Sequence, residues 1–308
     1  MARRRTKRST SQILFYVLSV LMVLSMALGY ALIASPASQP TPPPATPALG
    51  RTVQPTAVPP TATAPAPTIT PIPLPPRATV DAAATQYSFA IIGDSAGNPE
   101  VYRSLLKQVE ADGNSFLIHL GGMVEKGTPA EFQAWRETMA GFTLPVHTAP
   151  GSSDLEAGSL ANYLAFTGAP GARYSFDQGL VHFAVVDSSR GYLTVEDTTW
   201  LDADLSGTQK PVKMVALHAP PFDPRGSDQI MTMGNEAFLL LMKQRGVKYV
   251  FAGNVHAYDQ TSQDGVIYVI SGGGGASLSR AEADGGFYHY VQVSVNGVDI
   301  QTEVRRLK

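Results

Sequence analysis

The chain has 308 residues and a formal net charge of −2, with 23 Lys and Arg against 25 Asp and Glu. The first 80 residues contain seven of these basic side chains and no acidic one, so the remainder carries 16 basic against 25 acidic side chains, a net charge of −9. Such an acidic segment is a poor general binder of nucleic acid, whose phosphates need Lys and Arg. There is no cysteine, which excludes disulfides and thiolate metal sites.

The N-terminal region has the pattern of a membrane anchor. Residues 1–12 form a basic tail, and residues 13–34 then run without a single charged side chain. As a helix, this run would be about 33 Å long, enough to cross the hydrocarbon core. A cleaved signal peptide is the alternative, but its apolar region is usually about 7–15 residues. We therefore expect an uncleaved signal-anchor in the cell membrane, with the N-terminus cytoplasmic and the C-terminal domain extracytoplasmic.

Residues 35–84 are dominated by proline and threonine. The stretch 36–80 alone holds 15 of the 24 prolines of the chain. Such a composition cannot bury a core, and its proline density favours an extended polyproline II conformation. We expect a disordered, proline-rich linker, whose glycosylation the composition leaves open.

Residues 85–308 have the pattern of one globular domain in which strands and helices alternate. Strands are expected at 87–93, 115–120, 144–148, 173–176, 181–187, 212–217, 247–252, 266–270, 288–295 and 298–304. Helices are expected from Asn98-Pro99 with Val101, Leu105, Leu106 and Val109 inward, from a capping box at Thr128–Glu131 with Phe132, Trp135 and Met139 inward, and near 158–166, 195–205 and 229–244. The sequence Asn296-Gly297 indicates a final β-hairpin. The order predicts an α/β sandwich of two mixed sheets with helices outside.

Four of the expected strands end in polar or glycine-rich segments. They are YSFAIIGDS (87–95), SFLIHLGGM (115–123), KMVALHAPP (213–221) and VKYVFAGNVHAYD (247–259). In open α/β sheets, ligands bind where loops leave the carboxyl ends of strands. The four ends are therefore expected to converge on one site.

The ordered blocks IIGDSAG, HLGGMVEKG, APGSSD, ALHAPPF and FAGNVHAYD resemble the calcineurin-like metallophosphoesterase family, particularly its purple-acid-phosphatase-like branch. The resemblance covers about residues 87–300. It implies a hydrolase scaffold in which two divalent metal ions, about 3.5–4 Å apart, activate a bridging hydroxide against phosphorus.

The resemblance also implies which positions would hold the metals. Asp94, His218 and His256 match retained ligands of the family pattern. The replaced positions are Ala96, often a histidine; Gly122, the aspartate shared by both metals; Ser152 and Ser153, an Asn-His pair; and Asn254, a histidine. Asp154, the aspartate that ends the third block, is kept.

The missing shared carboxylate argues against a normal dinuclear centre. Two unit charges 4 Å apart repel by about 4 kcal/mol at an effective dielectric of 20, and two dications by roughly four times as much. Gly122 has no charge to offset this repulsion. A single zinc, manganese or iron ion remains open, because Asp94, His218 and His256 form a two-histidine, one-carboxylate set. Glu125 and Asn254 are possible additional ligands.

Two functions remain open. The domain is either a pseudo-phosphoesterase that binds a ligand or partner without turnover, or a phosphatase or phosphodiesterase that uses one metal or an atypical pair. In the second case His218 is the candidate catalytic residue, because it would ligate the metal or position the phosphate. Neither the small-molecule phosphoester nor the protein partner is identified by the sequence.

Overall fold

The computed structural model describes residue 71 and residues 77–308. The basic tail at 1–12, the expected anchor at 13–34 and most of the expected linker at 35–84 lie outside this part. Among the residues it does describe, no helix has the length and apolar character needed to cross a membrane.

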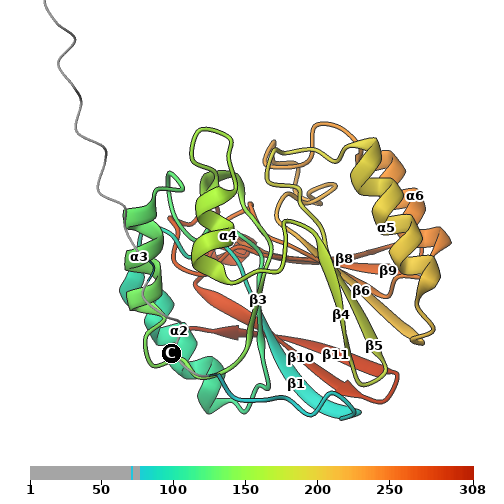
Figure 1. The fold of residues 1–308 in the computed structure, drawn as a ribbon, viewed down its shortest axis with the longest axis horizontal. Coiled ribbons are helices and arrows are strands. Elements are labelled where there is room, and N and C mark those ends of the chain that lie inside the picture. The colour runs from blue at the N-terminus through green and yellow to red at the C-terminus, as the bar shows by residue number, and fades with distance from the viewer. Residues whose placement is uncertain (1–70, 72–76) are drawn as a thin grey trace, which may run out of the picture. The chain divides into compact units, whose positions relative to one another are not determined.

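Two mixed β-sheets pack face to face (Figure 1). The first has the order β11 (Asp299–Arg306), β10 (His289–Asn296), β1 (Gln86–Ile92), β2 (Leu117–His119) and β3 (Val146–Thr148). The second has the order β4 (Tyr174–Gln178), β5 (Val181–Val185), β6 (Val212–Leu217), β7 (Tyr249–Ala252), β9 (Val266–Ser271) and β8 (Tyr258–Gln263). In the first sheet β1, β2 and β3 run parallel, and in the second sheet β5, β6, β7 and β9 run parallel. The remaining strands, β10, β11, β4 and β8, pair antiparallel with their neighbours.

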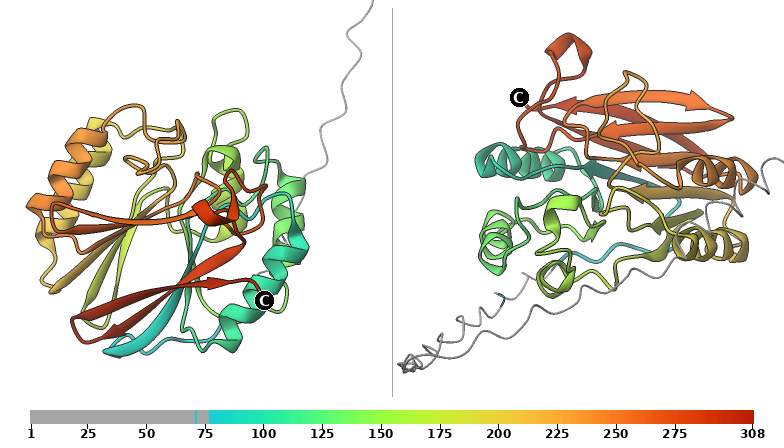
Figure 2. Two further views of the ribbon diagram at one scale, coloured as in Figure 1. Left: turned by 180° about the vertical axis from the view of Figure 1, so that it is seen from behind. Right: turned by 90° about the horizontal axis from the view of Figure 1, so that it is seen from above.

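Helices cover the outer face of each sheet, which confirms the expected sandwich (Figures 1 and 2). Helices α2 (Pro99–Ala111), α3 (Pro129–Thr138) and α4 (Ala161–Thr167) pack on the five-stranded sheet, and α5 (Val195–Gly207) and α6 (Asn235–Gln244) pack on the six-stranded sheet. Two short 3₁₀ helices, Ser152–Asp154 and Glu282–Asp284, complete the described elements. Aromatic side chains join the two sheets, with the Phe89 ring stacked on Phe116 at 4.9 Å and meeting Phe183 edge-on at 5.2 Å.

Local capping explains why two of the helices begin where the sequence predicts. The Asn98 side chain accepts a hydrogen bond from the backbone N–H of Val101 at the start of α2. Thr128 and Glu131 form the expected reciprocal capping box of α3. Such caps satisfy backbone donors that lack a partner in the first turn. The buried face of α2 includes Tyr102 in place of the expected Val101, which is only half-buried.

The helix expected at 229–244 is wrong in its first turn and a half, because α6 begins only at Asn235. The preceding segment is held in an extended form: the N–H of Met231 donates to Pro220 O and the N–H of Thr232 donates to Gly191 O. Gly234 then adopts φ +85°, a left-handed conformation that interrupts a helix. The apolar pattern of Met231 therefore reflects packing of a loop, not of a helix.

Strand β8 has no counterpart among the expected strands. Its residues are polar and mostly half-buried or exposed, since it forms the edge of the six-stranded sheet. Only its antiparallel pairing with β9 reveals it.

The end of the expected linker lies against the domain. Arg77 donates from Nη1 to Leu144 O at 2.6 Å, and Val80 packs against the core between the sheets. Residues 77–84 are thus part of the folded structure, although their composition resembles the segment before them.

Candidate functional site

The carboxyl ends of four strands meet at one pocket, as expected. Asp94 follows β1, Gly122 follows β2, His218 follows β6 and Asn254 follows β7. Backbone hydrogen bonds tie the ends together, among them Asp94 N–H to Gly121 O and Gly253 N–H to His218 O, both at 2.9 Å. The pocket has a volume of about 420 Å³ and is lined by Asp94, Ala96, Gly97, Gly122, Val124, Glu125, Ser152, Ser153, His218, Gln229, Asn254, His256, Ala276 and Ser277.

Asp94 lies at the floor of this pocket and is only 3% exposed. Its Oδ2 accepts the backbone N–H of Asn254 at 2.8 Å. Burial raises the pKa of the Asp94 carboxyl well above its usual range; the bond from Asn254 opposes the rise and the nearby Asp154 carboxylate adds to it. Asp94 and Asn254 both have positive φ, +58° and +66°, a conformation that non-glycine residues rarely adopt and that recurs at functional sites.

The two retained histidines flank Asp94 without bonding to it. His218 Nδ1 lies 4.0 Å and His256 Nε2 lies 3.8 Å from Asp94 Oδ1, beyond hydrogen-bond range. Both rings are held by backbone carbonyls instead: His218 Nδ1 lies 2.9 Å from Leu120 O and His256 Nδ1 lies 2.8 Å from Ser277 O. These bonds leave Nε2 of each neutral ring unprotonated. Burial lowers the pKa of His218 to about 4, so that ring is neutral at ordinary pH.

Gly122 has no room for a side chain while Asp94 keeps its present position. A β carbon added at Gly122 would lie 2.4 Å from Asp94 Oδ1 and 3.1 Å from Asp94 Cα. Gly122 also has φ +69°, which strains any residue with a β carbon. The present position of the Asp94 carboxylate is thus incompatible with a shared metal ligand at residue 122.

Asp154 is a structural clamp and not a pocket ligand. It is fully buried, and its two oxygens accept the backbone N–H groups of Gly122, Met123, Val124 and Gly151 at 2.7–3.1 Å. Burial raises the pKa of Asp154 to about 6, although the four backbone donors oppose that rise. The retained aspartate of the third block therefore shapes the loop after β2.

The remaining candidate positions line the pocket without forming a ligand set. Ala96, Ser152 and Ser153 carry no charge, and Glu125 is exposed at the rim. The Asn254 side chain donates from Nδ2 to Gln229 O at 2.9 Å and also interacts with His218. Within residues 77–308, no three His, Asp or Glu side chains are arranged as a metal-binding group.

The residues present do not fit a dinuclear centre, because Gly122 supplies no shared carboxylate and Glu125, the other carboxylate of the described pocket lining, lies at the exposed rim. One ion is compatible with part of the site. Asp94 Oδ1 and His256 Nε2 are 3.8 Å apart, a separation that one ion with ligand bonds of about 2.0–2.1 Å can bridge. His218 would have to turn to join them, since the Nδ1 that faces Asp94 is the one that donates to Leu120 O.

Two pocket residues were missed by the sequence. Ser277 orients His256, and Gln229 accepts from Asn254. The apolar pattern predicts a helix that includes Gln229. The run Pro220–Gly226 just before it contains three prolines and a glycine, a composition that indicates a loop.

The glycine run at 272–275 serves close packing. A β carbon at Gly272 would lie 2.7 Å from Asp94 Oδ2, and the N–H groups of Gly272 and Gly274 donate to Ala257 O and Gly93 O. These donors are therefore already used, which argues against an anion cradle here.

Comparison with known proteins agrees with this geometry. The family model of calcineurin-like phosphoesterases matches residues 87–258, more than half of the chain. The chain belongs to the calcineurin-like phosphoesterase family. It is 26% identical over 187 residues to a glycerophosphodiester phosphodiesterase, GpdQ, from Enterobacter lignolyticus, covering 56% of this chain and 66% of that protein. It is 23% identical over 163 residues to a 3′,5′-cyclic-nucleotide phosphodiesterase from Nostoc, covering 50% of this chain and 60% of that protein.

Two solved structures of this family fold are similar. A purple acid phosphatase, PPD1, from yellow lupin seeds superposes with a TM-score of 0.61 at 18% identity, covering 72% of this chain and 52% of that one. The structure described as GAP50, the anchor in the inner membrane complex of Plasmodium, superposes with a TM-score of 0.60 at 14% identity, covering 73% and 86%. At such low identity these likenesses concern the fold.

Proposed function

We propose that this protein is a membrane-tethered, extracytoplasmic phosphoesterase-family domain that binds a ligand or partner in its pocket without hydrolysing it. The observation that carries the proposal is that Gly122 brings no carboxylate to the pocket and has no room for one while Asp94 keeps its position, since a β carbon at 122 would lie 2.4 Å from Asp94 Oδ1. Fold alone does not determine function, because the same scaffold serves with and without chemistry. Function depends on the side chains at the strand ends, and here the position of the shared ligand is a glycine.

Electrostatics supports the loss of the dinuclear reaction. Two dications about 4 Å apart repel by roughly 16 kcal/mol at an effective dielectric of 20. Among the described residues that line the pocket, Asp94 and Glu125 are the only carboxylates, and Glu125 lies at its exposed rim. Ser152, Ser153 and Asn254 add hydrogen-bonding groups but no negative charge.

One of the similar structures is described by an anchoring role. GAP50 is described as an anchor in a membrane complex. The basic residues 1–12 and the uncharged residues 13–34 supply the corresponding tether in this chain. On this proposal the proline-rich segment holds the domain away from the membrane surface.

Hydrolysis with one divalent metal is the second candidate. It is favoured by the 3.8 Å separation of Asp94 Oδ1 and His256 Nε2 and by the phosphodiesterases among the relatives. Asp94 and His256 would hold the ion, and His218 would join it or orient the phosphate. Zinc, manganese or iron would polarise the phosphoryl oxygen and lower the pKa of a bound water.

The test is turnover of an aryl phosphate and a bis-aryl phosphodiester by the purified chain with added manganese or zinc. We expect no hydrolysis above the rate of the Asp94→Ala, His256→Ala double variant. Turnover that is lost in each single variant would establish the one-metal hydrolase instead. A mature N-terminus near residue 35, detected by mass spectrometry, would remove the tether from the proposal.

A further inference from the structure

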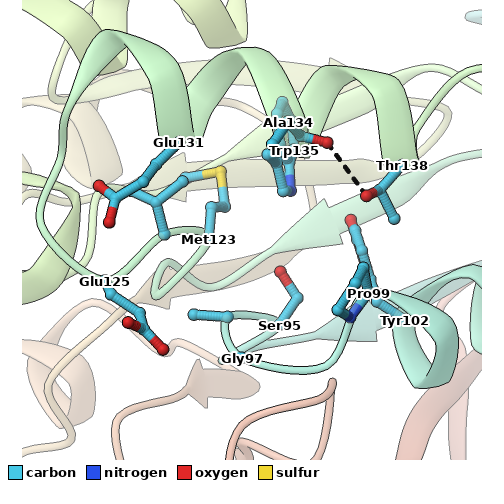
Figure 3. A pocket seen from close by; sticks show the side chains of 12 residues that line it. Ser95, Gly97, Pro99, Tyr102, Met123, Glu125, Glu131, Ala134, Trp135 and Thr138 are labelled. Atoms are coloured by element: carbon cyan, nitrogen blue, oxygen red, sulfur yellow. Dashed lines mark hydrogen bonds between the residues drawn. The ribbon is translucent and has the colours of Figure 1, made fainter.

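A second pocket adjoins the first behind the loop that follows β1. It has a volume of about 220 Å³ and lies between this loop, the start of α2 and the inner side of α3 (Figure 3). Its lining is Ser95, Ala96, Gly97, Pro99, Tyr102, Met123, Val124, Glu125, Glu131, Ala134, Trp135 and Thr138. Since a cavity of about 150 Å³ is enough to hold benzene, this one has room for a small ring.

The two pockets share a wall. Ala96, Gly97, Val124 and Glu125 line both of them. Ala96 contributes only a methyl group to this wall, at the position where the family resemblance implies a larger histidine. A ligand that lies across these four residues would contact both pockets.

Ser95 brings a hydrogen-bond donor to this apolar lining. His119 Nδ1 accepts the N–H of Gly121 at 3.2 Å, so the neutral ring carries its proton on Nε2, which lies 3.0 Å from Ser95 Oγ. The imidazole thus donates to the serine oxygen, and the serine hydroxyl proton remains free to donate elsewhere. Figure 3 shows the Ser95 oxygen on the side of the pocket that faces Trp135.

Trp135 adds a second donor. Its side chain is 5% exposed, and its indole Nε1 is buried without a hydrogen-bond partner among the described residues. The Tyr102 hydroxyl donates to the Met139 sulfur; burial raises its pKa, and a weak side-chain hydrogen bond from Trp135 opposes that rise. Because that bond lies outside ordinary hydrogen-bond geometry, the indole N–H is able to take a better acceptor. Figure 3 shows the indole nitrogen at the end of the ring nearer Ser95. A buried donor without an acceptor is costly, and an acceptor oxygen between Trp135 and Ser95 would satisfy it.

The charge around the pocket restricts the acceptor. Glu125 and Glu131 line it, and both are carboxylates that repel a second anion. Met123, Val124, Pro99 and Ala134 give the remaining surface an apolar character. A neutral carbonyl, amide or ester oxygen on a ring or short aliphatic group satisfies both conditions.

We infer that this second pocket is the binding site for the organic part of the ligand, an apolar group that carries a neutral acceptor oxygen held by Ser95 and Trp135. The inference rests on the proposed function only in that the polar part of the same ligand would lie beside Asp94. Its test uses a probe of the second pocket alone, so the two can fail separately.

The probe is benzamide, titrated into the ¹⁵N-labelled full-length chain in detergent micelles. The chain has two tryptophans, Trp135 and Trp200, so Trp200→Phe leaves a single indole N–H resonance that belongs to Trp135. We expect benzamide to move this resonance in a saturable manner and downfield, as a new hydrogen bond requires. Benzoate, which has the same ring but a negative charge, is expected to bind at least tenfold more weakly. No saturable shift with benzamide, or equal binding of benzoate, would overturn the inference.

Matched variants separate the pocket from general effects. Ala134 and Ala130 are both exposed on α3, but only Ala134 lines the pocket. Ala134→Leu is expected to abolish the shift and Ala130→Leu to preserve it; the opposite result would contradict the site. Ser95→Ala is expected to weaken benzamide binding about 3- to 10-fold through loss of one hydrogen bond. Asp94→Asn is expected to leave the shift intact, whatever it does to metal binding or turnover.

Discussion

Asp94 leaves no room for a side chain at Gly122, because a β carbon on Gly122 would lie 2.4 Å from Asp94 Oδ1. The carboxylate is fixed from its other side by the N–H of Asn254. The site is thus arranged around the absence of a side chain at 122.

Gly122→Ala tests this contact. We expect it to lower the free energy of unfolding by about 2–4 kcal/mol, since it combines a positive φ with a clash. Gly113→Ala is the matched control, because Gly113 has φ +74° but nothing within 4 Å of an added β carbon. It is expected to cost about 1 kcal/mol. Urea unfolding of the two variants gives the comparison, and equal losses would contradict the clash.

A double-variant cycle assigns the clash to Asp94. In an Asp94→Ala background, Gly122→Ala should cost no more than about 1 kcal/mol beyond the Gly113→Ala control, because the opposing oxygen is gone. The same urea unfolding series measures it. An undiminished cost in that background would place the strain in the backbone alone.

Asp154→Asn should destabilise the domain by about 2–4 kcal/mol, because an amide cannot accept all four backbone N–H groups that the carboxylate accepts. Amide hydrogen exchange should become faster at Gly122, Met123 and Val124 in particular. Asp299→Asn, at an exposed position of β11, is the control and should be neutral. An Asp154→Asn variant with an unchanged free energy of unfolding would show that the hydrogen bonds to Asp154 contribute little to stability.

Buried histidines make the domain sensitive to acid. Burial lowers the pKa of four imidazoles from 6.5 to about 3 or 4: His119, His147, His218 and His289. Each is neutral in the folded state but takes up a proton on unfolding below pH 6.5. Their contribution is therefore fully present above pH 6.5 and is lost as the pH falls toward 4.

Two buried carboxyls act in the opposite direction. Burial raises the pKa of Asp154 to about 6 and that of Asp94 well above its usual range, so their contribution is present below about pH 4 and is lost as the pH rises. Between pH 4 and 6, the stability lost through the four histidines on acidification exceeds the stability regained through the two carboxyls. We expect the free energy of unfolding to fall by roughly 1–3 kcal/mol per pH unit on acidification through this window. Urea midpoints at pH 7 and pH 4.5 measure it, and equal midpoints would contradict the balance.

Much of the fold followed from the sequence because its signals were local. The Asn98 cap, the capping box at Thr128 and the β-hairpin whose loop is Gly297–Val298 depend on residues a few positions apart. Strand β8 and the extended segment before α6 depend on partners distant in the chain, and they were missed. A polar edge strand such as β8 has no alternation of apolar and polar residues that would indicate a strand in the sequence.

Only part of the site could be predicted from the sequence. Matching motif positions predicted that Asp94, Gly122, His218 and His256 would share one pocket. The motif positions did not predict that Asp94 would leave no room for a side chain at Gly122. They also did not predict that each histidine would bond to a backbone carbonyl and not to Asp94. Those outcomes depend on side-chain orientation, which the order of motifs does not specify.

Chelator treatment should leave the melting temperature of the purified chain unchanged. The domain has a continuous core between its sheets, and Asp94 and His256 are held in place by the backbone groups of Asn254 and Ser277. Thermal unfolding with and without a strong chelator tests this. A fall of several degrees that is reversed by zinc or manganese would contradict it.

The central claim is that the pocket has lost the dinuclear centre of its family. The most direct measurement is metal content per chain, by mass spectrometry of the protein purified without chelator and then equilibrated with zinc or manganese. We expect at most one bound ion per chain, and we expect Asp94→Ala and His256→Ala each to weaken its binding. Two tightly bound ions per chain, lost together in Asp94→Ala, would contradict it.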